Sequence, residues 1–505
     1  MQSGNRVILN TAILYIKMAV SIVIGLYSTR LILQALGVED YGLYNLVAGI
    51  VSMLSFLNTS LAASTQRFLS FSLGKDDIDK VSKVFYYSVI LHILIAFTVI
   101  ILIEVIGTYG IRNWLVIDNS RIETAVSVLH LLCVSIFFTI VSVPYMAVLI
   151  SRENMLLLSI SEILQSIMKL GLAFFLLQYI GNRLLIYSLL MAIIMILTLI
   201  FQIILCNIKY PEVHFHWQKL NDKSLFKSLL SYAGWYSFAS IGSIGRFQGI
   251  PIIMNLFFGV VANAAYGIAN QVNGLMQFFA TAIMQSIRPQ ITKSEGSGDR
   301  KRSIRLSLIA CKYMYFLCAF FTIPVILETP YILELWLGNV PLYTIEFCRL
   351  ILLATLCFMI SNGLNSAVDA TGNIKYTYVI VGCLHFLILP IGYLLYKIGL
   401  PIYTILWIVV IEELICMIVR MICAKQIVGI SIKEYIVKAL LPILIVTIIS
   451  VALGIIPVIV FSESFMRLIL CCLLYWSSFI ITSWLIGMDI SEKQRIIQIF
   501  HKLKK

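Results

Sequence analysis

The stretch YGLYNLVAG at residues 41–49 returns as YGIANQVNG at residues 266–274. Tyr, Gly, Asn, Val and Gly recur in register between the two copies. Each copy follows an apolar segment that ends in a glycine turn, at Gly37 in the first half and at Gly259 in the second. Self-similarity between segments this far apart indicates one structural unit that occurs twice. We therefore expect two related lobes.

Two further pairs of segments follow in the same order. An arginine precedes a Gly/Asp turn in both halves, Arg67 before LGKDD and Arg288 before GSGD. The segment SVPYMAVLISREN at 142–154 is echoed by SNGLNSAVDATGN at 361–373. A single match is easily found in apolar sequence, but three matches in one order support the repeat.

The composition identifies the solvent in which this chain folds. Of its 505 residues, 60% are hydrophobic and 12% are charged, against about 25% charged in soluble domains. Long apolar runs exclude a soluble enzyme, a disordered chain, a secreted disulfide scaffold and a β-barrel. The sequence predicts an all-α polytopic membrane protein with about 14 transmembrane helices. The expected crossings lie at about 9–36, 42–65, 84–106, 124–150, 155–179, 184–206, 229–257, 264–287, 304–327, 346–369, 376–398, 402–424, 439–461 and 467–488.

The repeat divides these crossings into two six-helix lobes. Because six is even, both lobes enter the membrane in the same direction, and a pseudo-twofold axis is expected along the membrane normal. The last two helices fall outside the repeat. The expected parts are an N-terminal lobe at 1–206, a cytoplasmic linker at 207–228, a second lobe at 229–425, and two extra helices with a basic tail at 426–505.

The distribution of the net charge of +13 indicates how the chain is oriented in the membrane. About 25 Lys and Arg residues lie at the two termini and in the loops on their side, and about five lie opposite. Both termini are therefore expected in the cytoplasm, and the excess charge does not indicate nucleic acid. A second Gly/Ser-rich cytoplasmic connector is expected at 288–302.

Signals for a metal or cofactor are weak. The spacing His214-Phe-His216 suits a metal, but it is more typical of an amphipathic surface segment. No phosphate-binding loop of the form GxxxxGK[ST] and no GxSxG motif occur in the sequence. We predict no cofactor, no metal, no catalytic residues and no enzymatic activity.

Three basic residues lie inside expected crossings of the two lobes' first helices. They are Lys17, Arg30 and Arg246, and neither helix contains an acidic residue that can neutralise them. Charges in a membrane are costly, so these residues are expected to face a cavity and to bind an anion. Lys17 and Arg30 can share that cavity only if the first helix bends, which is expected near Gly25. Arg30 has the alternative of snorkelling to the interface.

Other charged residues in the expected crossings have two possible interpretations. Glu162 and Lys169 share a helix face about 10 Å apart, and Glu412, Glu413 and Arg420 lie in one late crossing. One interpretation is that each pairs with a neighbouring helix inside its lobe. The other is that Glu162 or Glu412 couples transport to protons or sodium ions.

The seventh and eighth crossings are unusually polar. Gly242, Gly245, Gly249 and Pro251 surround Arg246 and Gln248, and they are expected to loosen the helix and supply a hinge. In the next crossing Asn270, Asn273 and Gln277 share a face and Gln271 lies beside it. Such a stripe suits sugar hydroxyls or, alternatively, interhelical hydrogen bonds.

The N-terminal residues resemble a family. The stretch STRLILQALGVEDYGLYNLVAGIVSMLSFLN at 28–58, followed by TQRFLSFSLGKDD at 65–77, is similar to the opening of Wzx-type lipopolysaccharide (O-antigen) repeat-unit flippases. These belong to the polysaccharide branch of the multidrug/oligosaccharidyl-lipid/polysaccharide (MOP) exporters. The resemblance implies a MATE-like fold of two six-helix bundles around a cationic cavity. The cavity candidates that follow are Lys17, Arg30, Asn45, Arg246, Gln248, Asn270 and Gln271, joined by Asn273 of the polar stripe.

The same resemblance implies an activity and a location. The expected substrate is an undecaprenyl-pyrophosphate-linked oligosaccharide for O-antigen, capsule or another surface polysaccharide. It would move from the cytoplasmic to the periplasmic leaflet of the bacterial inner membrane, with a polysaccharide polymerase and a chain-length regulator as possible partners. The alternatives are a cation-coupled multidrug exporter of the same fold, a peptidoglycan-precursor flippase, and a membrane glycosyltransferase or polysaccharide polymerase.

Overall fold

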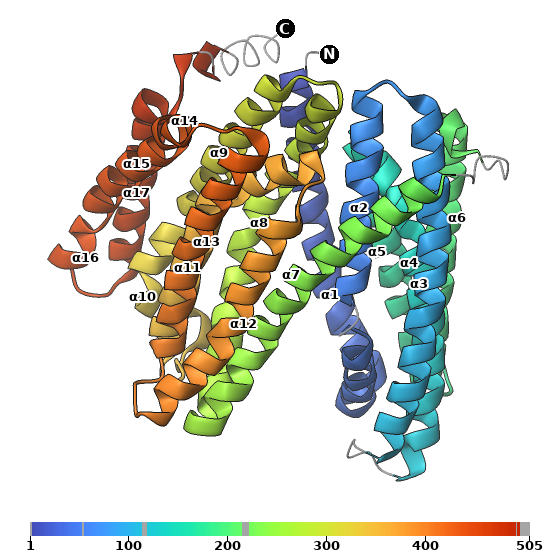
Figure 1. The fold of residues 1–505 in the computed structure, drawn as a ribbon. Coiled ribbons are helices and arrows are strands. Elements are labelled where there is room, and N and C mark those ends of the chain that lie inside the picture. Colours follow the sequence, from blue (N-terminus) through green and yellow to red (C-terminus); the bar gives the residue numbers. More distant parts are fainter. Residues whose placement is uncertain (1–2, 53–54, 114–118, 215–221, 491, 495–505) are drawn as a thin grey trace, which may run out of the picture. The chain divides into compact units, whose positions relative to one another are not determined.

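A computed structural model describes residues 3–52, 55–113, 119–214, 222–490 and 492–494, and the regular structure of these residues is entirely helical (Figure 1). The all-α prediction is confirmed. Among the described residues, ten helices are long and apolar enough to cross a membrane. The chain forms two compact units, an N-terminal unit, Leu9–Ser237, and a C-terminal unit, Phe238–Lys505 with Met1–Ile8. The linker expected at 207–228 groups with the N-terminal unit, apart from residues 215–221, which lie outside the described residues.

The N-terminal unit packs its helices around one apolar core. Long helices form because apolar runs bury one side against neighbours while the backbone bonds internally, as a membrane requires. Buried residues of the core include Ile32, Val99, Leu129 and Leu176, from four different helices. The elements are α1 (Ser3–Ser52), α2 (Ser55–Gly74), α3 (Ile78–Asn113), the 3₁₀ turn Asn119–Arg121, α4 (Ile122–Ser151), α5 (Met155–Gln178), α6 (Arg183–Lys209) and the 3₁₀ turn Pro211–Val213.

The C-terminal unit begins within α7, whose sequence continues from the N-terminal unit without a break in the helix. Its core contains Ile250, Ala265, Phe347 and Leu406. The elements are α7 (Lys223–Phe258), α8 (Val260–Gly296), α9 (Arg300–Leu327), α10 (Thr329–Leu337), α11 (Thr344–Thr371), α12 (Lys375–Lys397), α13 (Thr404–Val428), α14 (Ile432–Tyr435), the π-helix Ile436–Leu440, α15 (Leu441–Gly454), α16 (Ile456–Val460), α17 (Phe465–Thr482) and the π-helix Ser483–Gly487.

Four of the expected crossings are not among the ten apolar spans. The crossing at 42–65 includes residues 53–54, which lie outside the described residues. The other three are helical in α7, α8 and α13 but are more polar, and α13 carries Glu412, Glu413 and Arg420. For these four segments a membrane crossing stays a prediction. The connector expected at 288–302 is wrong over its first part, because α8 continues to Gly296.

Positions that repeat in the sequence also repeat in backbone conformation. Gly37 interrupts α1 with φ 78° and ψ 170°, and Gly259 precedes α8 with φ 75° and ψ −166°. In the third pair of segments the aligned residues Glu153 and Gly372 have φ 58° and 83°. Such dihedral angles are uncommon outside glycine, so their recurrence at matched positions is strong support for an internal repeat.

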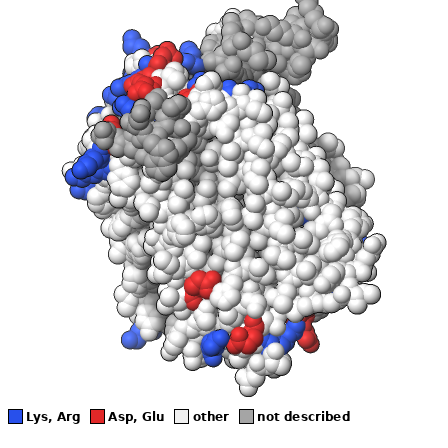
Figure 2. All heavy atoms as spheres, turned by 90° about the vertical axis from the view of Figure 1, so that its right-hand side faces the viewer, with Lys and Arg blue, Asp and Glu red and all other residues white. Residues whose placement is uncertain are grey.

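The surface of the N-terminal unit has the pattern of a membrane protein. On the face in Figure 2, most Lys, Arg, Asp and Glu residues gather towards the two ends, and uncharged residues cover most of the surface between them. Large apolar side chains of α3 are exposed, including Leu94, Phe97, Ile101 and Val105. An exposed apolar surface of this length is expected to contact lipid.

Candidate functional site

Lys17 is paired inside the N-terminal unit. Its Nζ lies 2.5 Å from Oε2 of Glu162, and the two side chains are 16% and 28% exposed. The contact joins α1 to α5. The acid that neutralises Lys17 thus comes from another helix, and the interpretation that Glu162 pairs with a neighbouring helix is confirmed. The partner is absent from the lysine's own helix because packing supplies it from a helix 145 residues away.

Arg246 is neutralised in the same way inside the C-terminal unit. Its Nη1 donates to Oε2 of Glu412 at 2.8 Å and to Oε1 of Glu413 at 2.9 Å. The carboxylates are 5% and 4% exposed, and the arginine is 20% exposed. The helix that carries Arg246 has no acid of its own, and α13 brings two adjacent acids against it.

The two acids of α13 belong to a larger buried cluster. Oε1 of Glu412 lies 2.9 Å from Nδ1 of His385 and accepts a hydrogen bond from the thiol of Cys416 at 2.9 Å. On the other side, Arg420 lies 3.5 Å from Oε2 of Glu413. Two guanidinium groups thus face two carboxylates, and the cluster is neutral when both acids are ionised and His385 is not. The two adjacent acids in an otherwise apolar segment indicated this cluster in the sequence. Nothing in the sequence indicated that His385 belongs to it.

Three of the predicted site residues are exposed and keep their polar groups available. They are Arg30 on α1, Gln248 on α7 and Gln271 on α8. Within the described residues, none of the three has a hydrogen bond or an ion pair. A bend near Gly25 is wrong, since the only non-helical dihedral angles inside α1 are those of Gly37.

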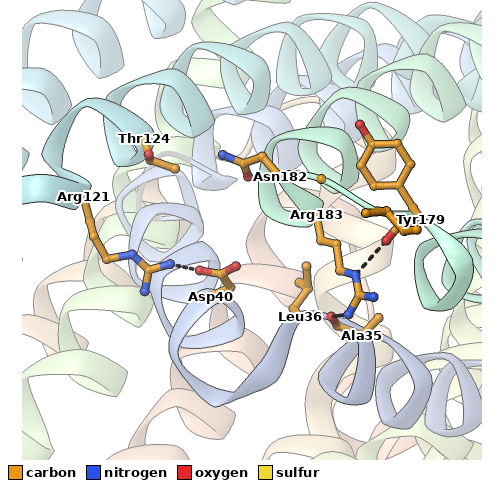
Figure 3. A pocket seen from close by; sticks show the side chains of 10 residues that line it. Ala35, Leu36, Asp40, Arg121, Thr124, Tyr179, Asn182 and Arg183 are labelled. Carbon is orange, nitrogen blue, oxygen red and sulfur yellow. Dashed lines mark hydrogen bonds and ion pairs between the residues drawn. The ribbon is translucent and has the colours of Figure 1, made fainter.

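Two arginines contact the residues on either side of the helix interruption at Gly37. Nη1 of Arg183 donates to the carbonyl oxygen of Ala35 at 2.8 Å, which satisfies an acceptor left open where the helix is broken (Figure 3). Arg121 forms an ion pair with Asp40 in the first turn after the glycine. These residues line a pocket of about 490 Å³. The pocket lies at the end of the unit that the charge distribution predicts to be external.

The glycines of α7 serve packing. A Cβ atom on Gly242 would lie 2.8 Å from the carbonyl oxygen of Gly382 in α12, and one on Gly249 would lie 2.7 Å from the side chain of Leu389. The helix continues through Pro251 to Phe258. The prediction of a loosened segment is therefore wrong in this conformation, because the small residues instead allow α7 and α12 to approach closely.

The polar stripe of α8 binds protein groups. Oδ1 of Asn273 accepts a hydrogen bond from Thr355 of α11 at 2.6 Å, and Gln277 donates to the same hydroxyl at 3.4 Å. The interhelical alternative is confirmed for these two residues. Asn270 donates to the carbonyl oxygen of Tyr266 at 2.9 Å, and the matched Asn45 donates to Tyr41 at 2.9 Å.

The histidine pair at the linker is only partly described. His216 lies outside the described residues, and Nε2 of His214 lies 3.1 Å from the carbonyl oxygen of Asn207. Among the described residues no group of three or more His, Cys, Asp or Glu side chains is placed to hold a metal ion.

Solved structures identify the fold. The crystal structure of MATE in the straight conformation superposes with a TM-score of 0.73 and 14% identity, over 85% of this chain and 97% of that one. An outward-facing multidrug resistance MATE family transporter of the MOP superfamily gives 0.70 and 13%, over 85% and 96%. A MOP superfamily transporter from Pyrococcus furiosus, described by the reverse polarity of its binding pocket, gives 0.68 and 13%, over 85% and 96%. The chain thus has the MATE-type fold, and its long apolar helices make it a multi-pass membrane protein.

The sequence identifies the branch. The family model described as "Polysaccharide biosynthesis protein" matches residues 3–295. The chain belongs to this family, which confirms the resemblance to the polysaccharide branch of the MOP exporters. No curated protein matches the sequence.

Proposed function

We propose that this protein is a flippase for lipid-linked oligosaccharides. It moves undecaprenyl-pyrophosphate-linked repeat units from the cytoplasmic to the periplasmic leaflet of a bacterial inner membrane by alternating access. The observation that carries the proposal is the combination of a polysaccharide biosynthesis family with the fold of a membrane transporter. A pathway that assembles its sugar units on a lipid in one leaflet needs a protein that carries the polar head across.

The intramembrane side chains support this substrate class in two ways. Arg30 is exposed on α1 and is available for an anionic head group, as are the amides of Gln248 and Gln271 for sugar hydroxyls. Lys17 and Arg246 contribute to binding only if the anionic group of the substrate replaces their carboxylate partners. Asn45, Asn270 and Asn273 would contribute the donor and acceptor sites that their present hydrogen bonds leave open.

Ion coupling is a second part of the proposal. Glu162 pairs with Lys17, so protonation of Glu162 would leave Lys17 without its counter-charge. Glu412 pairs with Arg246, which would keep its contact with Glu413 if Glu412 were protonated. A proton gradient would thereby control whether the ammonium group of Lys17 is available to the substrate.

The alternative is a cation-coupled multidrug exporter, since one similar solved structure is a multidrug resistance MATE family transporter. Against it, the segments expected to line the cavity, at 9–36, 42–65, 229–257 and 264–287, contain no Asp or Glu. A peptidoglycan-precursor flippase would differ only in the head group, and a polymerase would need catalytic residues that the cluster in α13 does not offer.

The test uses the full-length protein in liposomes that contain an undecaprenyl-pyrophosphate oligosaccharide with a fluorescent sugar. An impermeant quencher reports the fraction of label in the outer leaflet. We expect protein-dependent loss of the protected inner pool, slower with Arg30→Met and unchanged with Arg112→Met, which removes a charge from an exposed ion pair. A stable protected pool, together with ethidium efflux under a proton gradient in the same liposomes, would establish the exporter instead.

A further inference from the structure

The pocket beside the helix interruption in α1 lies wholly inside the N-terminal unit. Its walls come from α1, from the start of α4 and from the connection between α5 and α6. Figure 3 shows Arg121 and Thr124 on one side of the pocket. Arg183 and Tyr179 lie on the other side, with Asn182 between the two groups. The volume of about 490 Å³ falls within the range of ~300–1,000 Å³ for small-molecule sites, so a mono- or disaccharide is of a suitable size.

Several polar groups in this lining are available to a ligand. The hydroxyl groups of Thr124 and Tyr179 form no hydrogen bond within the described residues. Asn182 caps α6 through its Oδ1, which accepts from the backbone N–H of Leu185 at 3.1 Å, and among the described residues its Nδ2 has no acceptor. Arg183 uses Nε and Nη1 to donate to two carbonyl oxygens, which leaves Nη2. The pocket thus offers hydroxyl, amide and guanidinium groups from different helices.

The charges of the lining nearly balance. Arg121 pairs with Oδ1 of Asp40, and the second carboxylate oxygen of Asp40 lies outside that contact. In the part of the chain that the structure describes, Arg183 has no acidic partner. A diphosphate would need mainly cationic donors, whereas a sugar hydroxyl group both donates and accepts a hydrogen bond. A lining that mixes donors and acceptors with little net charge therefore suits a sugar.

The second half of the repeat shows that the fold does not require a polar site here. Asp40 directly precedes Tyr41 of the first copy, and Ala265 directly precedes Tyr266 of the second. Ala265 and Tyr266 are 0% and 7% exposed and belong to the apolar core of the C-terminal unit. Asp40, by contrast, is 22% exposed and lines the pocket. An acid at a position that otherwise completes an apolar core indicates a role beyond folding.

We infer that this pocket is a binding site for one or two sugar rings on the predicted external side of the protein. Thr124, Asn182 and the open oxygen of Asp40 bind sugar hydroxyl groups, and the ring of Tyr179 forms one wall. The sugar belongs to the repeat unit of the substrate, so this inference rests on the proposed function. By the predicted orientation, a sugar that is bound here has already crossed the membrane.

The site selects repeat units by their sugars. A pocket that is built to hydrogen-bond a hydroxyl group discriminates against a ligand that lacks it, because the polar groups of the pocket are then left unpaired. Thr124 lies in the first turn of α4, and Asn182 precedes α6. Two hydroxyl groups at different positions of one ring are therefore recognised together, independently of the lipid and its phosphates.

The test measures equilibrium binding of free sugars to the purified full-length protein by titration calorimetry. Galactose, N-acetylglucosamine and glucuronic acid represent neutral, acetylated and acidic sugars, and inorganic phosphate is the fourth probe. Thr124→Val removes a hydroxyl group and keeps the shape of the side chain. Asn182→Asp removes the amide donors and keeps a residue that caps α6. Thr98→Val is the matched control, because the exposed hydroxyl of Thr98 on α3 donates to the carbonyl oxygen of Leu94.

We expect at least one sugar to bind saturably. The double variant Thr124→Val/Asn182→Asp should raise its dissociation constant about tenfold, since two hydrogen bonds to the sugar are lost. Thr98→Val should bind as the unmodified protein does. Melting temperatures of the same samples should stay unchanged, because neither substitution in the pocket removes a bond to the protein. If the double variant does not fold, Thr124→Val alone is expected to weaken binding about threefold.

The inference is wrong if none of the three sugars binds, or if the substitutions in the pocket leave sugar binding unchanged. Binding of phosphate alone also overturns it, because the pocket would then be an anion site. In each of these cases the liposome assay of lipid-linked oligosaccharide movement still tests the proposed function independently. Sugar binding that depends on Thr124 and Asn182, in a protein that does not move the labelled lipid, would support the inference and contradict the proposed function.

Discussion

Nη1 of Arg246 lies 2.9 Å from Oε1 of Glu413, a residue 167 positions further along the chain. The arginine on the first long helix of the C-terminal unit is thereby fixed to α13, and the same nitrogen also contacts Glu412. An arginine in this arrangement holds two buried carboxylates in place before it can meet any ligand. Its substitution consequently tests structure and binding together, and the two effects need separate readouts.

Arg246→Met is expected to destabilise the C-terminal unit. Removal of one partner from a buried ion pair costs about 3–5 kcal/mol, because the remaining charge is left uncompensated. The melting temperature and the membrane abundance of the variant should both fall. The double variant Arg246→Met/Glu413→Gln restores the charge balance of the cluster and should recover most of the stability. A single variant that melts with the unmodified protein would contradict this account of the cluster.

Glu162→Gln is expected to have a smaller effect in the N-terminal unit. The pair with Lys17 is partly exposed, so the cost is about 1–3 kcal/mol after allowance for solvent screening. Thermal unfolding of the purified protein measures it. The control is Glu123→Gln, whose ion pair with Arg112 is exposed and should contribute less than about 1 kcal/mol. Equal effects of the two substitutions would show that the Lys17 pair has no special role.

The sequence predicted the repeat and the helices well because these depend on local pattern. Apolar runs of membrane-spanning length and a recurring glycine turn are visible without knowledge of tertiary contacts. The charge pairs were not predictable in the same way. Lys17 and Arg246 lacked acids on their own helices, and only packing showed which distant helix supplies a partner.

The same limit applies in the opposite direction to Lys169. Its spacing places it on a face with Glu162, and a partner on a neighbouring helix was expected for both residues. Among the described residues Glu162 has such a partner, and Lys169 has none. Thr355, which bonds Asn273 and Gln277, had no signal in the sequence at all. The hydrogen-bond partner of a single hydroxyl group on an apolar helix can be predicted only when the facing helix is known.

Gly37→Ala and Gly259→Ala are expected to destabilise the protein to a similar extent. Both glycines have positive φ, and a Cβ atom at either position meets no atom within 4 Å. The cost is therefore backbone strain, of about 1–3 kcal/mol. Gly42→Ala and Gly274→Ala are matched controls, since both positions are helical and open, and alanine there is neutral or stabilises by up to about 1 kcal/mol. The melting temperatures of all four variants test this prediction. It is contradicted if Gly37→Ala leaves the melting temperature unchanged while Gly42→Ala lowers it.

Arg467 and Glu328 connect the last two membrane helices to the rest of the C-terminal unit. Nη2 of Arg467 donates to Oε2 of Glu328 at 2.7 Å, and its Nε donates to Oε1 at 3.0 Å. The side chains are 7% and 0% exposed. This bidentate contact joins the start of α17 to the end of α9, and Lys312 of α9 contacts Glu492 beyond α17 at 2.6 Å. The hairpin of α15 and α17 is thus tied to α9 at both ends.

Arg467→Met is expected to lower the stability of that attachment by about 3–5 kcal/mol, because Glu328 is left buried without a counter-charge. Limited proteolysis should release fragments that end near the α13–α14 connection earlier than in the unmodified protein. Arg467→Lys should be only partly effective, since an ammonium group cannot reproduce the bidentate geometry. Lys438→Met removes an exposed pair with Glu434 and should leave the digestion pattern unchanged. If Arg467→Met digests like Lys438→Met, the hairpin is held by its apolar contacts with α9, and the ion pair serves another purpose.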